Sequence, residues 1–202
     1  QLAYSDYKNL ETKQMDVARF ASDLNNPSRQ LLGNTQLNWL TSAITKSNAK
    51  WQVLGQQVLM TKMWLPTEIF SQSDRTKIPQ VLKELVTIKK AVLANKAVTP
   101  AQLARVNTLM PYNLDAWDGY PSEREALYKS VTALNKKLVV VAGDTHNAWH
   151  GTLKNAKGES VGVEFATPGV TSPGMEHYLA LNTAQAKQMA DSLSLLINDL
   201  NY

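Results

Sequence analysis

The sequence predicts an α/β fold in which a mixed sheet is covered by helices. Two short apolar runs, Trp51–Val58 and Leu138–Ala142, are rich in β-branched residues and lie next to or contain glycine, which is typical of buried strands. Segments with apolar residues at helical spacing lie between and after these runs. Buried strands of this kind are usually parallel and packed against helices on both faces.

Length and composition fit one globular domain over residues 1–202. The chain is 44% hydrophobic and 19% charged, and it is long enough to bury a core. No apolar run approaches the roughly 20 residues of a membrane span. The net charge of +4 is scattered along the chain, so it gives no support for nucleic-acid binding. The absence of cysteine excludes disulfides, cysteine-ligated zinc and a cysteine nucleophile within this chain.

Two helices are predicted ahead of the first strand. Residues 15–24 form a short helix that ends at Asn25-Asn26-Pro27. A second helix follows, with Asn34 as its N-cap. Its apolar face comprises Leu37, Trp39, Leu40 and Ile44. The strand Trp51–Val58 comes next, and it leads into a polar loop over residues 61–77.

The segment 61–110 is predicted to be a helical insertion at the edge of the domain. Its first helix is indicated by a stripe of apolar residues at Ile78, Val81, Leu82, Leu85, Ile88 and Val92. Its second helix opens at the capping box Thr99-Pro100-Ala101-Gln102 and runs through Leu109. The helical pair either packs on the core or forms an arm that binds a partner.

A loop rich in aromatic and acidic residues, Pro111–Tyr120, precedes the next helix. This composition around Gly119 favours a rigid wall near a pocket, or a packed loop anchored by Trp117. Ser122-Glu123-Arg124-Glu125 matches a second capping box. It begins a helix that leads directly into the strand Leu138–Ala142. The apolar residues of that helix are Leu127, Val131 and Leu134.

Trp149–Lys154 and Ser160–Ala166 are predicted to form an antiparallel hairpin. One face of the second strand carries Val161, Val163 and Phe165. Glu164 therefore faces the opposite side, where a surface or supporting role is expected. The last segment is predicted to be a helix. Its apolar stripe comprises Met189, Leu193, Leu196 and Leu200.

The strongest candidate site is Gly143-Asp144-Thr145-His146, directly after the central strand. Ligands of α/β sheets bind outside the carboxyl ends of the strands. In extended backbone, Asp144 and His146 point to one side with their Cα atoms roughly 6–7 Å apart. A carboxylate and an imidazole at that separation can converge on one metal ion. The alternative is that both side chains only form hydrogen bonds at the strand end.

The sequence alone does not show the other ligands that a metal ion would need. A metal site takes at least three protein groups. His150 is expected to face away in the next strand, and His177 is expected on the surface. Serine-nucleophile elbows, phosphate-binding loops and dinucleotide fingerprints are absent from the sequence.

Several segments share their pattern with a known family. They are Arg29–Leu40 (Arg-x-Leu-Leu-Gly-x-x-Gln-x-x-Trp-Leu), Trp51–Met60, Ala116–Pro121 with Arg124, Val139–Trp149 (Gly-Asp-x-His-x-x-Trp), and Glu164-Phe165 followed by Thr171–Gly174. In this order they resemble the alkaline phosphatase D (PhoD-type) family of metallophosphatases. The resemblance runs from about Arg29 to Gly174, and the segment 61–110 matches least well.

This resemblance implies that the chain is the C-terminal half of a four-layer αββα sandwich, in which two mixed sheets lie between helices. It implies that Asp144 and His146 are metal ligands, with iron and calcium as the metals. The residues implied to line the site are Trp117, Asp118, Tyr120, Trp149 and the loop Thr171–Gly174. The expected protein is a periplasmic or extracellular metal-dependent hydrolase of phosphate esters.

The upstream half of such an enzyme, which supplies the other ligands, is expected to precede Gln1. The chain is then a fragment that is essentially inactive alone, and its partners are the missing N-terminal half and a phosphate-ester substrate. An exposed sheet face in such a half-sandwich would favour self-association. The competing hypothesis is a non-catalytic α/β module whose helical arm binds a partner.

Overall fold

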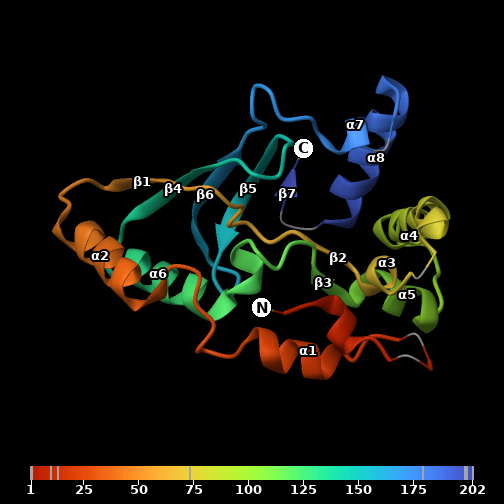
Figure 1. Ribbon diagram of the computed structural model, residues 1–202, viewed down its shortest axis with the longest axis horizontal. Coiled ribbons are helices and arrows are strands. Elements are labelled where there is room, and N and C mark those ends of the chain that lie inside the picture. The colour runs from red at the N-terminus through yellow and green to blue at the C-terminus, as the bar shows by residue number, and fades with distance from the viewer. Residues whose placement is uncertain are drawn as a thin grey trace.

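A five-stranded mixed sheet forms the centre of the computed structural model, which describes residues 2–9, 11–12, 14–72, 74–178, 180–197 and 200–201 (Figure 1). The strand order is β1-β4-β6-β5-β7. The strands are β1 (Trp51–Gly55), β4 (Lys137–Ala142), β5 (Trp149–Lys154), β6 (Ser160–Ala166) and β7 (Leu200–Asn201). The predicted α/β class, a mixed sheet with helices, is confirmed. The four-layer sandwich stays a prediction, because the described residues form one large sheet.

The sheet combines parallel and antiparallel pairs. β1, β4 and β6 run parallel, whereas β5 is antiparallel to both β6 and β7. Both strands of the predicted hairpin have the expected bounds. The close approach of β4 to β6 depends on Gly162, because a Cβ there would lie 1.9 Å from the carbonyl oxygen of Leu138.

β1 is an edge strand, so the prediction of a buried strand over Trp51–Val58 was wrong. In the described sheet β1 pairs with β4 alone and ends at Gly55. The side chains of Trp51 and Val53 are 58% and 70% exposed. Strand propensity reports a fit to a pleated surface, and it does not tell what covers that surface.

Helices α2 (Gly33–Lys46) and α6 (Pro121–Ala133) pack together on one side of the sheet (Figure 1). Neither begins at the predicted cap. Asn34 lies inside α2, and the Ser122 hydroxyl of α6 donates to the carbonyl oxygen of Asn25 at 3.0 Å. Trp39 of α2 is 67% exposed, so its predicted place on the apolar face was also wrong.

A contact between distant segments replaces the predicted local cap of α2. The buried carboxylate of Glu123 accepts the N–H groups of Leu31, Leu32 and Gly33 at 2.5, 2.9 and 3.0 Å. The first N–H groups of a helix have no partner within the helix, and a negative charge at this end is favourable. Glu123 thus fixes the start of α2 against α6.

The predicted insertion 61–110 contains β2 (Trp64–Pro66) near its start and reaches β3 (Leu109–Pro111) at its end, and these two short strands pair antiparallel. It contains the α-helices α3 (Thr67–Ser71), α4 (Ile78–Leu93) and α5 (Pro100–Asn107), and a 3-10 turn over Arg75–Lys77. The capping box at Thr99 is confirmed. The predicted loop over 61–77 was wrong, because β2 and α3 form within it.

Charged side chains hold these three helices together. The Arg105 guanidinium of α5 donates to Glu68 at 2.7 Å and to Glu84 at 2.8 Å, which joins α3, α4 and α5. α4 also packs against α8 (Thr183–Leu196), which follows the short helix α7 (Met175–Tyr178). In the predicted stripe of α8 Leu196 is buried, but Leu200 lies past the helix in β7.

The N-terminal elements form a second, smaller apolar cluster. They are the 3-10 helix η1 (Tyr4–Tyr7) and α1 (Val17–Leu24). The buried residues of this cluster are Tyr7, Phe20, Leu24, Met110 and Leu114. Among the described residues, no helix is both long enough and apolar enough to cross a membrane.

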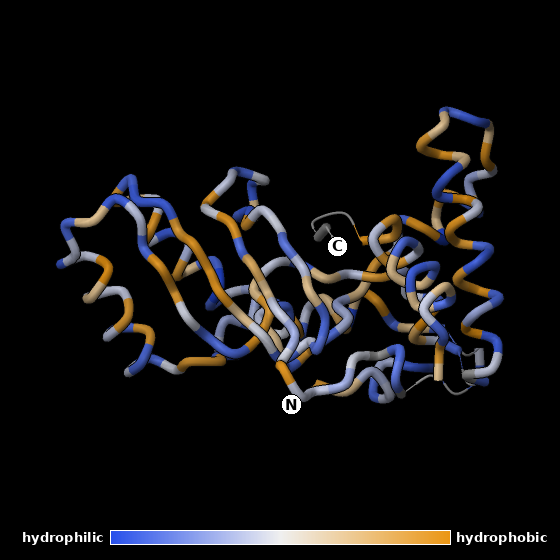
Figure 2. Tube along the Cα trace, turned by 90° about the horizontal axis from the view of Figure 1, so that it is seen from above, coloured by the Kyte–Doolittle hydropathy of each residue, from blue (hydrophilic) through white to orange (hydrophobic). Residues whose placement is uncertain are grey.

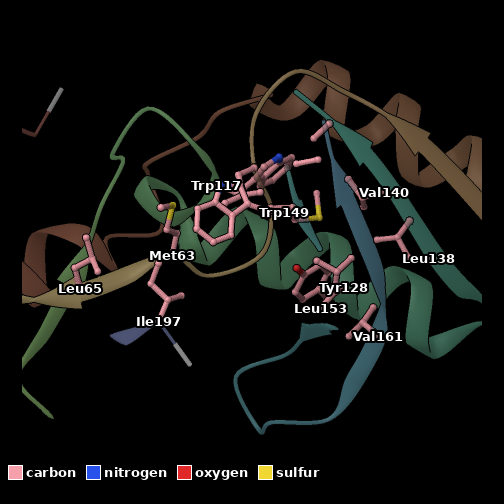
Figure 3. Packing of buried hydrophobic residues seen from close by; sticks show 14 of the residues in the cluster. Met63, Leu65, Trp117, Tyr128, Leu138, Val140, Trp149, Leu153, Val161 and Ile197 are labelled. Carbon is pink, nitrogen blue, oxygen red and sulfur yellow. The ribbon is translucent and has the colours of Figure 1, made fainter. Parts of the chain in front are cut away.

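The main core lies on one face of the five-stranded sheet. Leu138, Val140 and Leu153 are fully buried there, in one cluster with Trp117 and Trp149 (Figure 3). Apolar stretches run along the strands (Figure 2), but those of the opposite face remain exposed. The exposed apolar side chains of this open face are Trp51, Val53, Val141, Val163 and Phe165.

The predicted orientation of β6 was therefore inverted. Val163 and Phe165 are 36% and 50% exposed, whereas Glu164 between them is fully buried. Residues 163–165 alternate as predicted, but the apolar side chains were assigned to the core and the carboxylate to the surface. Val161, predicted to share the face of Val163, is itself buried. The arrangement is opposite because the core face carries small residues beside Glu164, namely Gly162 and Ala166, which leave room for helix α6.

Candidate functional site

The turn after β4, Gly143–His146, contains two residues with a left-handed backbone. Asp144 and His146 have positive φ angles of 64° and 57°. The N–H of Thr145 donates to the carbonyl oxygen of Gly143 at 2.7 Å. The extended backbone assumed for these residues from the sequence was therefore wrong. Non-glycine residues in this conformation cost free energy and tend to occur at functional sites.

His146 is held by a specific hydrogen bond. Its Nδ1 lies 3.0 Å from the carbonyl oxygen of Pro173, in the loop Thr171–Gly174. Because a carbonyl oxygen only accepts, Nδ1 carries the proton, and Nε2 keeps the lone pair that can bind a metal ion. His146 is half-buried and Asp144 is exposed. The loop from the family pattern thus orients the candidate ligand.

A cavity of about 640 Å³ lies beside this turn. His146 and Trp149 line it on one side, and Met63 and Tyr112 line it on another. Helix α8 contributes a further wall. Other residues that line the cavity include Pro168, Ser172, Glu176, Thr183 and Lys187. The mixed polar and apolar lining is what a site for a charged group attached to an organic group requires.

Three of the residues predicted to line the site lie elsewhere. Trp117 and Asp118 are buried behind the cavity, in a 3-10 helix (Trp117–Gly119). The Trp117 Nε1–H donates to the Gln56 side chain at 3.1 Å. The Arg29 guanidinium lies over the ring of Tyr120, and its Cζ atom is 5.1 Å from the ring centroid. Of the four single residues predicted, Trp149 alone borders the cavity at His146.

The described residues supply part of a metal site. Within them, no group of three or more metal-binding side chains comes together. His150 and His177 are both exposed and do not line the cavity. Asp144 and His146 have the chemistry of metal ligands, and the proton on Nδ1 of His146 favours ligation through Nε2. Two ligands fall short of the three that a site needs.

A cluster of buried charges lies behind the cavity wall. It surrounds the irregular segment Met60–Met63, which connects β1 to β2. The Glu164 carboxylate accepts the Met60 N–H at 2.9 Å and the Thr61 N–H at 2.6 Å. Asp118 accepts the Met63 N–H at 2.7 Å and an Arg124 N–H at 2.8 Å. Buried irregular backbone needs such partners, because it has none within a helix or strand.

Arg124 completes this cluster. Its guanidinium also donates to the Met60 carbonyl oxygen at 3.0 Å. Burial acts to lower the pKa of Arg124, but the Asp118 carboxylate opposes it and the net pKa is raised, so the group stays charged. Burial raises the pKa of Glu164 despite the opposing hydrogen bonds from Thr61 and Met60 and the positive charge of Arg124.

The sequence contained one signal for this cluster. Glu164 is a charged residue in a strand, and the residues two positions before and after it, Gly162 and Ala166, are small. Small residues mark a strand face against which other backbone packs closely. A carboxylate on such a face must find buried donors. The pairing of Glu164 with Met60 could not be inferred, because the two residues are brought together by the fold alone.

Comparisons with known proteins bear on this arrangement. A sequence model of the PhoD-like phosphatase family matches residues 2–201. The chain belongs to this family. Alkaline phosphatase D of Bacillus subtilis (strain 168) is 27% identical over 154 residues, which cover 74% of this chain and 20% of that protein. A solved structure of PhoD is 26% identical to this chain. The match covers 74% of this chain and 22% of the PhoD chain, with a TM-score of 0.47.

The match confirms the predicted family, and the chain spans about 20% of the length of the curated relative. Several residues of the PhoD-like pattern have structural roles here. The Arg29 guanidinium donates to the Gly119 carbonyl oxygen at 3.1 and 3.0 Å, which ties the Arg29–Leu40 segment to the 3-10 helix. A Cβ at Gly119 would lie 1.9 Å from the Leu114 carbonyl oxygen, so glycine is required there.

Proposed function

We propose that this chain is the C-terminal part of a metal-dependent hydrolase of phosphate esters, of the phosphatase or phosphodiesterase type. The observation that carries the proposal is the fixed orientation of His146. Its Nδ1 is 3.0 Å from the Pro173 carbonyl oxygen in a left-handed turn at the end of the central parallel strand. Such a second hydrogen bond to a carbonyl group is usual for metal-binding histidines.

In this proposal Asp144 and His146 hold metal from one side of the cavity. A bound metal ion supplies positive charge that polarises the phosphoryl oxygens of the ester. The cavity walls hold the organic part of the ester, through Trp149 on one side and Met63 on the other. In this role His146 would bind metal through the Nε2 lone pair, while Nδ1–H donates to the Pro173 carbonyl oxygen.

The remaining ligands are proposed to come from an upstream part of a longer polypeptide. Two ligands in the described residues support this, and so does the open face of the sheet. Contiguous exposed apolar side chains on a sheet usually mark a surface that another element covers. The proposal assigns that surface to the upstream half and makes the 202-residue chain inactive alone.

Iron and calcium are the metals proposed, and a periplasmic or extracellular location is proposed with them. Both rest on the resemblance to PhoD-type enzymes. Elemental analysis of the full-length protein tests the metals, and fractionation of the cells that make it tests the location. Stoichiometric zinc in place of iron, or confinement to the cytosol, would contradict these two statements without affecting the candidate ligands.

The test uses the full-length protein that carries this chain, with a nitrophenyl phosphodiester as substrate. Asp144→Asn and His146→Ala are each expected to lower activity by about 100-fold or more, since even groups that only support ligands contribute 10–100-fold. Both variants should also lose bound metal. Glu159→Gln is the matched control, because Glu159 is an exposed carboxyl in the turn between β5 and β6.

Three results would contradict the proposal. The first is full metal content and activity in both variants. The second is robust hydrolysis by the isolated 202-residue chain, which would show that no upstream ligand is needed. The third is a full-length protein without any bound metal, which would instead support the non-catalytic interaction module.

A further inference from the structure

The buried Glu164 carboxylate has no place in the proposed chemistry, but it forms hydrogen bonds to a segment that leads to the cavity. It lies on β6 in the centre of the sheet and is fully buried. Its two oxygens accept the N–H groups of two successive residues, Met60 and Thr61, at 2.6–3.1 Å. These residues lie in a connection that is buried and has no regular structure.

The connection that Glu164 holds leads directly to the cavity wall. Met63 lines the cavity, and its carbonyl oxygen accepts the Tyr112 N–H at 2.8 Å. Tyr112 lines the same cavity. On the other side of Met60, the Gln57 carbonyl oxygen accepts the N–H of Gly143 at 3.0 Å. Gly143 is the residue before Asp144, so the connection between β1 and β2 contacts the wall through Met63 and the candidate ligand turn through the exposed residue Gln57.

The opposite side of the segment is held as firmly. Asp118 accepts the Met63 N–H at 2.7 Å, and Arg124 donates to the Met60 carbonyl oxygen at 3.0 Å. The Arg124 and Asp118 side chains are 2% and 4% exposed. Hydrogen bonds to buried charged groups are short and directional, and they leave the segment little freedom. The segment therefore has one position relative to the sheet.

We propose that Glu164 is a positioning residue, which fixes the Met60–Met63 segment so that Met63 and Tyr112 form one wall of the cavity at His146. This inference rests on the proposed function for its effect on substrate. Glu164 itself does not line the cavity. The wall that it fixes contacts the organic part of the ester and not the reacting phosphorus, so the expected effect of its loss is on substrate binding.

The first test is amide hydrogen exchange in the 202-residue chain. Glu164→Gln presents an NH₂ group to backbone N–H donors, so at least one hydrogen bond is lost. The N–H groups of Tyr112 and Gly143 should then exchange about tenfold faster, as expected for a local opening that becomes easier. Asp118→Asn releases the same segment from its other side, and it should give the same pattern at Tyr112 if Glu164→Gln does not fold.

Glu123→Gln is the matched control. Glu123 is also a buried carboxylate that accepts backbone N–H groups, but those belong to Leu31, Leu32 and Gly33. The control should lose comparable stability and leave exchange at Tyr112 and Gly143 unchanged. Unchanged exchange in Glu164→Gln, or equal acceleration in Glu123→Gln, would overturn the proposal.

The second test is kinetic and uses the full-length protein. Glu164→Gln should raise KM about tenfold and change kcat by less than about threefold, because only uniform binding of substrate is affected. A lower kcat with unchanged KM would contradict the positioning role. If the full-length protein has no phosphatase activity, the proposed function fails, but the exchange experiment still decides whether Glu164 fixes the wall.

Discussion

The two faces of the five-stranded sheet have similar apolar side chains but very different surroundings. Leu138 and Val140 of β4 are fully buried on the face toward α6. Val141 on the opposite face is 44% exposed, and Phe165 of the neighbouring strand β6 is 50% exposed. Figure 1 shows α2 and α6 together on one side of the sheet. The face toward these helices also holds the buried Glu164 carboxylate.

This difference shows which face is completed within the chain. The helix-covered face packs its apolar side chains together and pairs its buried charges with described residues, although the buried Arg124 Nε–H has no hydrogen-bond partner among them. The open face carries exposed apolar side chains on β1, β4 and β6 and the polar side chains of His150 and Thr152 on β5, so its apolar part needs another apolar surface. We therefore expect substitutions on the covered face to change stability and substitutions on the open face to change association.

The largest effect on the free energy of unfolding is expected for Asp118→Ala, in the buried charge cluster on the helix-covered face. This variant leaves the Arg124 guanidinium, which is 2% exposed, without its carboxylate partner at 2.8 Å. Removing one partner of a buried pair typically costs about 3–5 kcal/mol, because a buried charge is left uncompensated. Urea unfolding measures this cost. A cost below about 1 kcal/mol would mean that the cluster is open to water, and the two faces would then differ less than described.

Leu138→Ala is expected to have the next largest effect. Leu138 is fully buried between the sheet and the helices, so the truncation should cost about 2–5 kcal/mol in the free energy of unfolding. Its control is Val53→Ala on the same sheet, since Val53 is 70% exposed and should cost well under 1 kcal/mol. If Leu138→Ala and Val53→Ala lowered the free energy of unfolding equally, the two faces of the sheet would not differ in burial as described.

A smaller effect is expected in the pH dependence of stability that arises from the titration of Glu164. Burial raises its pKa above the ordinary value of 4.5, so the folded chain holds this proton to higher pH than the unfolded chain. Its contribution to stability is then full below pH 4.5 and declines as the pH rises above that value. Glu164→Gln does not titrate. The stability of wild type relative to this variant should therefore fall as the pH rises above 4.5 in urea unfolding, and a rise would refute this.

The smallest effect on stability is expected for Phe165→Ser on the open face. It should change the free energy of unfolding of the isolated chain by less than about 0.5 kcal/mol. In solution, however, the wild-type chain should associate with a second copy through this face, and the variant should associate less. Light scattering over a concentration series measures both. A monomeric wild-type chain at every concentration would contradict this expectation.

Elements with a strong local pattern were predictable from the sequence. The capping box at Thr99, the helix beginning at Ile78 and both strands of the hairpin follow from residues close in the chain. The start of α2 was missed because its N–H groups are bound by Glu123, about 90 residues away. The edge position of β1 was missed because composition does not reveal which strands pair.

The candidate site was predictable to the extent that it depends on position in the chain. The place of Asp144 and His146 after the central strand could be inferred, because ligands bind at the carboxyl ends of parallel strands. The left-handed turn could not be, because neither residue is glycine. The wall formed by Met63 and Tyr112 was also missed, since it depends on buried hydrogen bonds among distant segments.

Under the proposed function, the left-handed conformation of Asp144 and His146 sets activity against heat resistance. Glycine at either position would adopt the same φ without the steric cost of a Cβ, a gain of roughly 1 kcal/mol. A population selected only for thermal survival would therefore accumulate glycine in this turn and lose both candidate ligands. Under the proposed function, aspartate and histidine persist there because selection acts on the metal that they would bind.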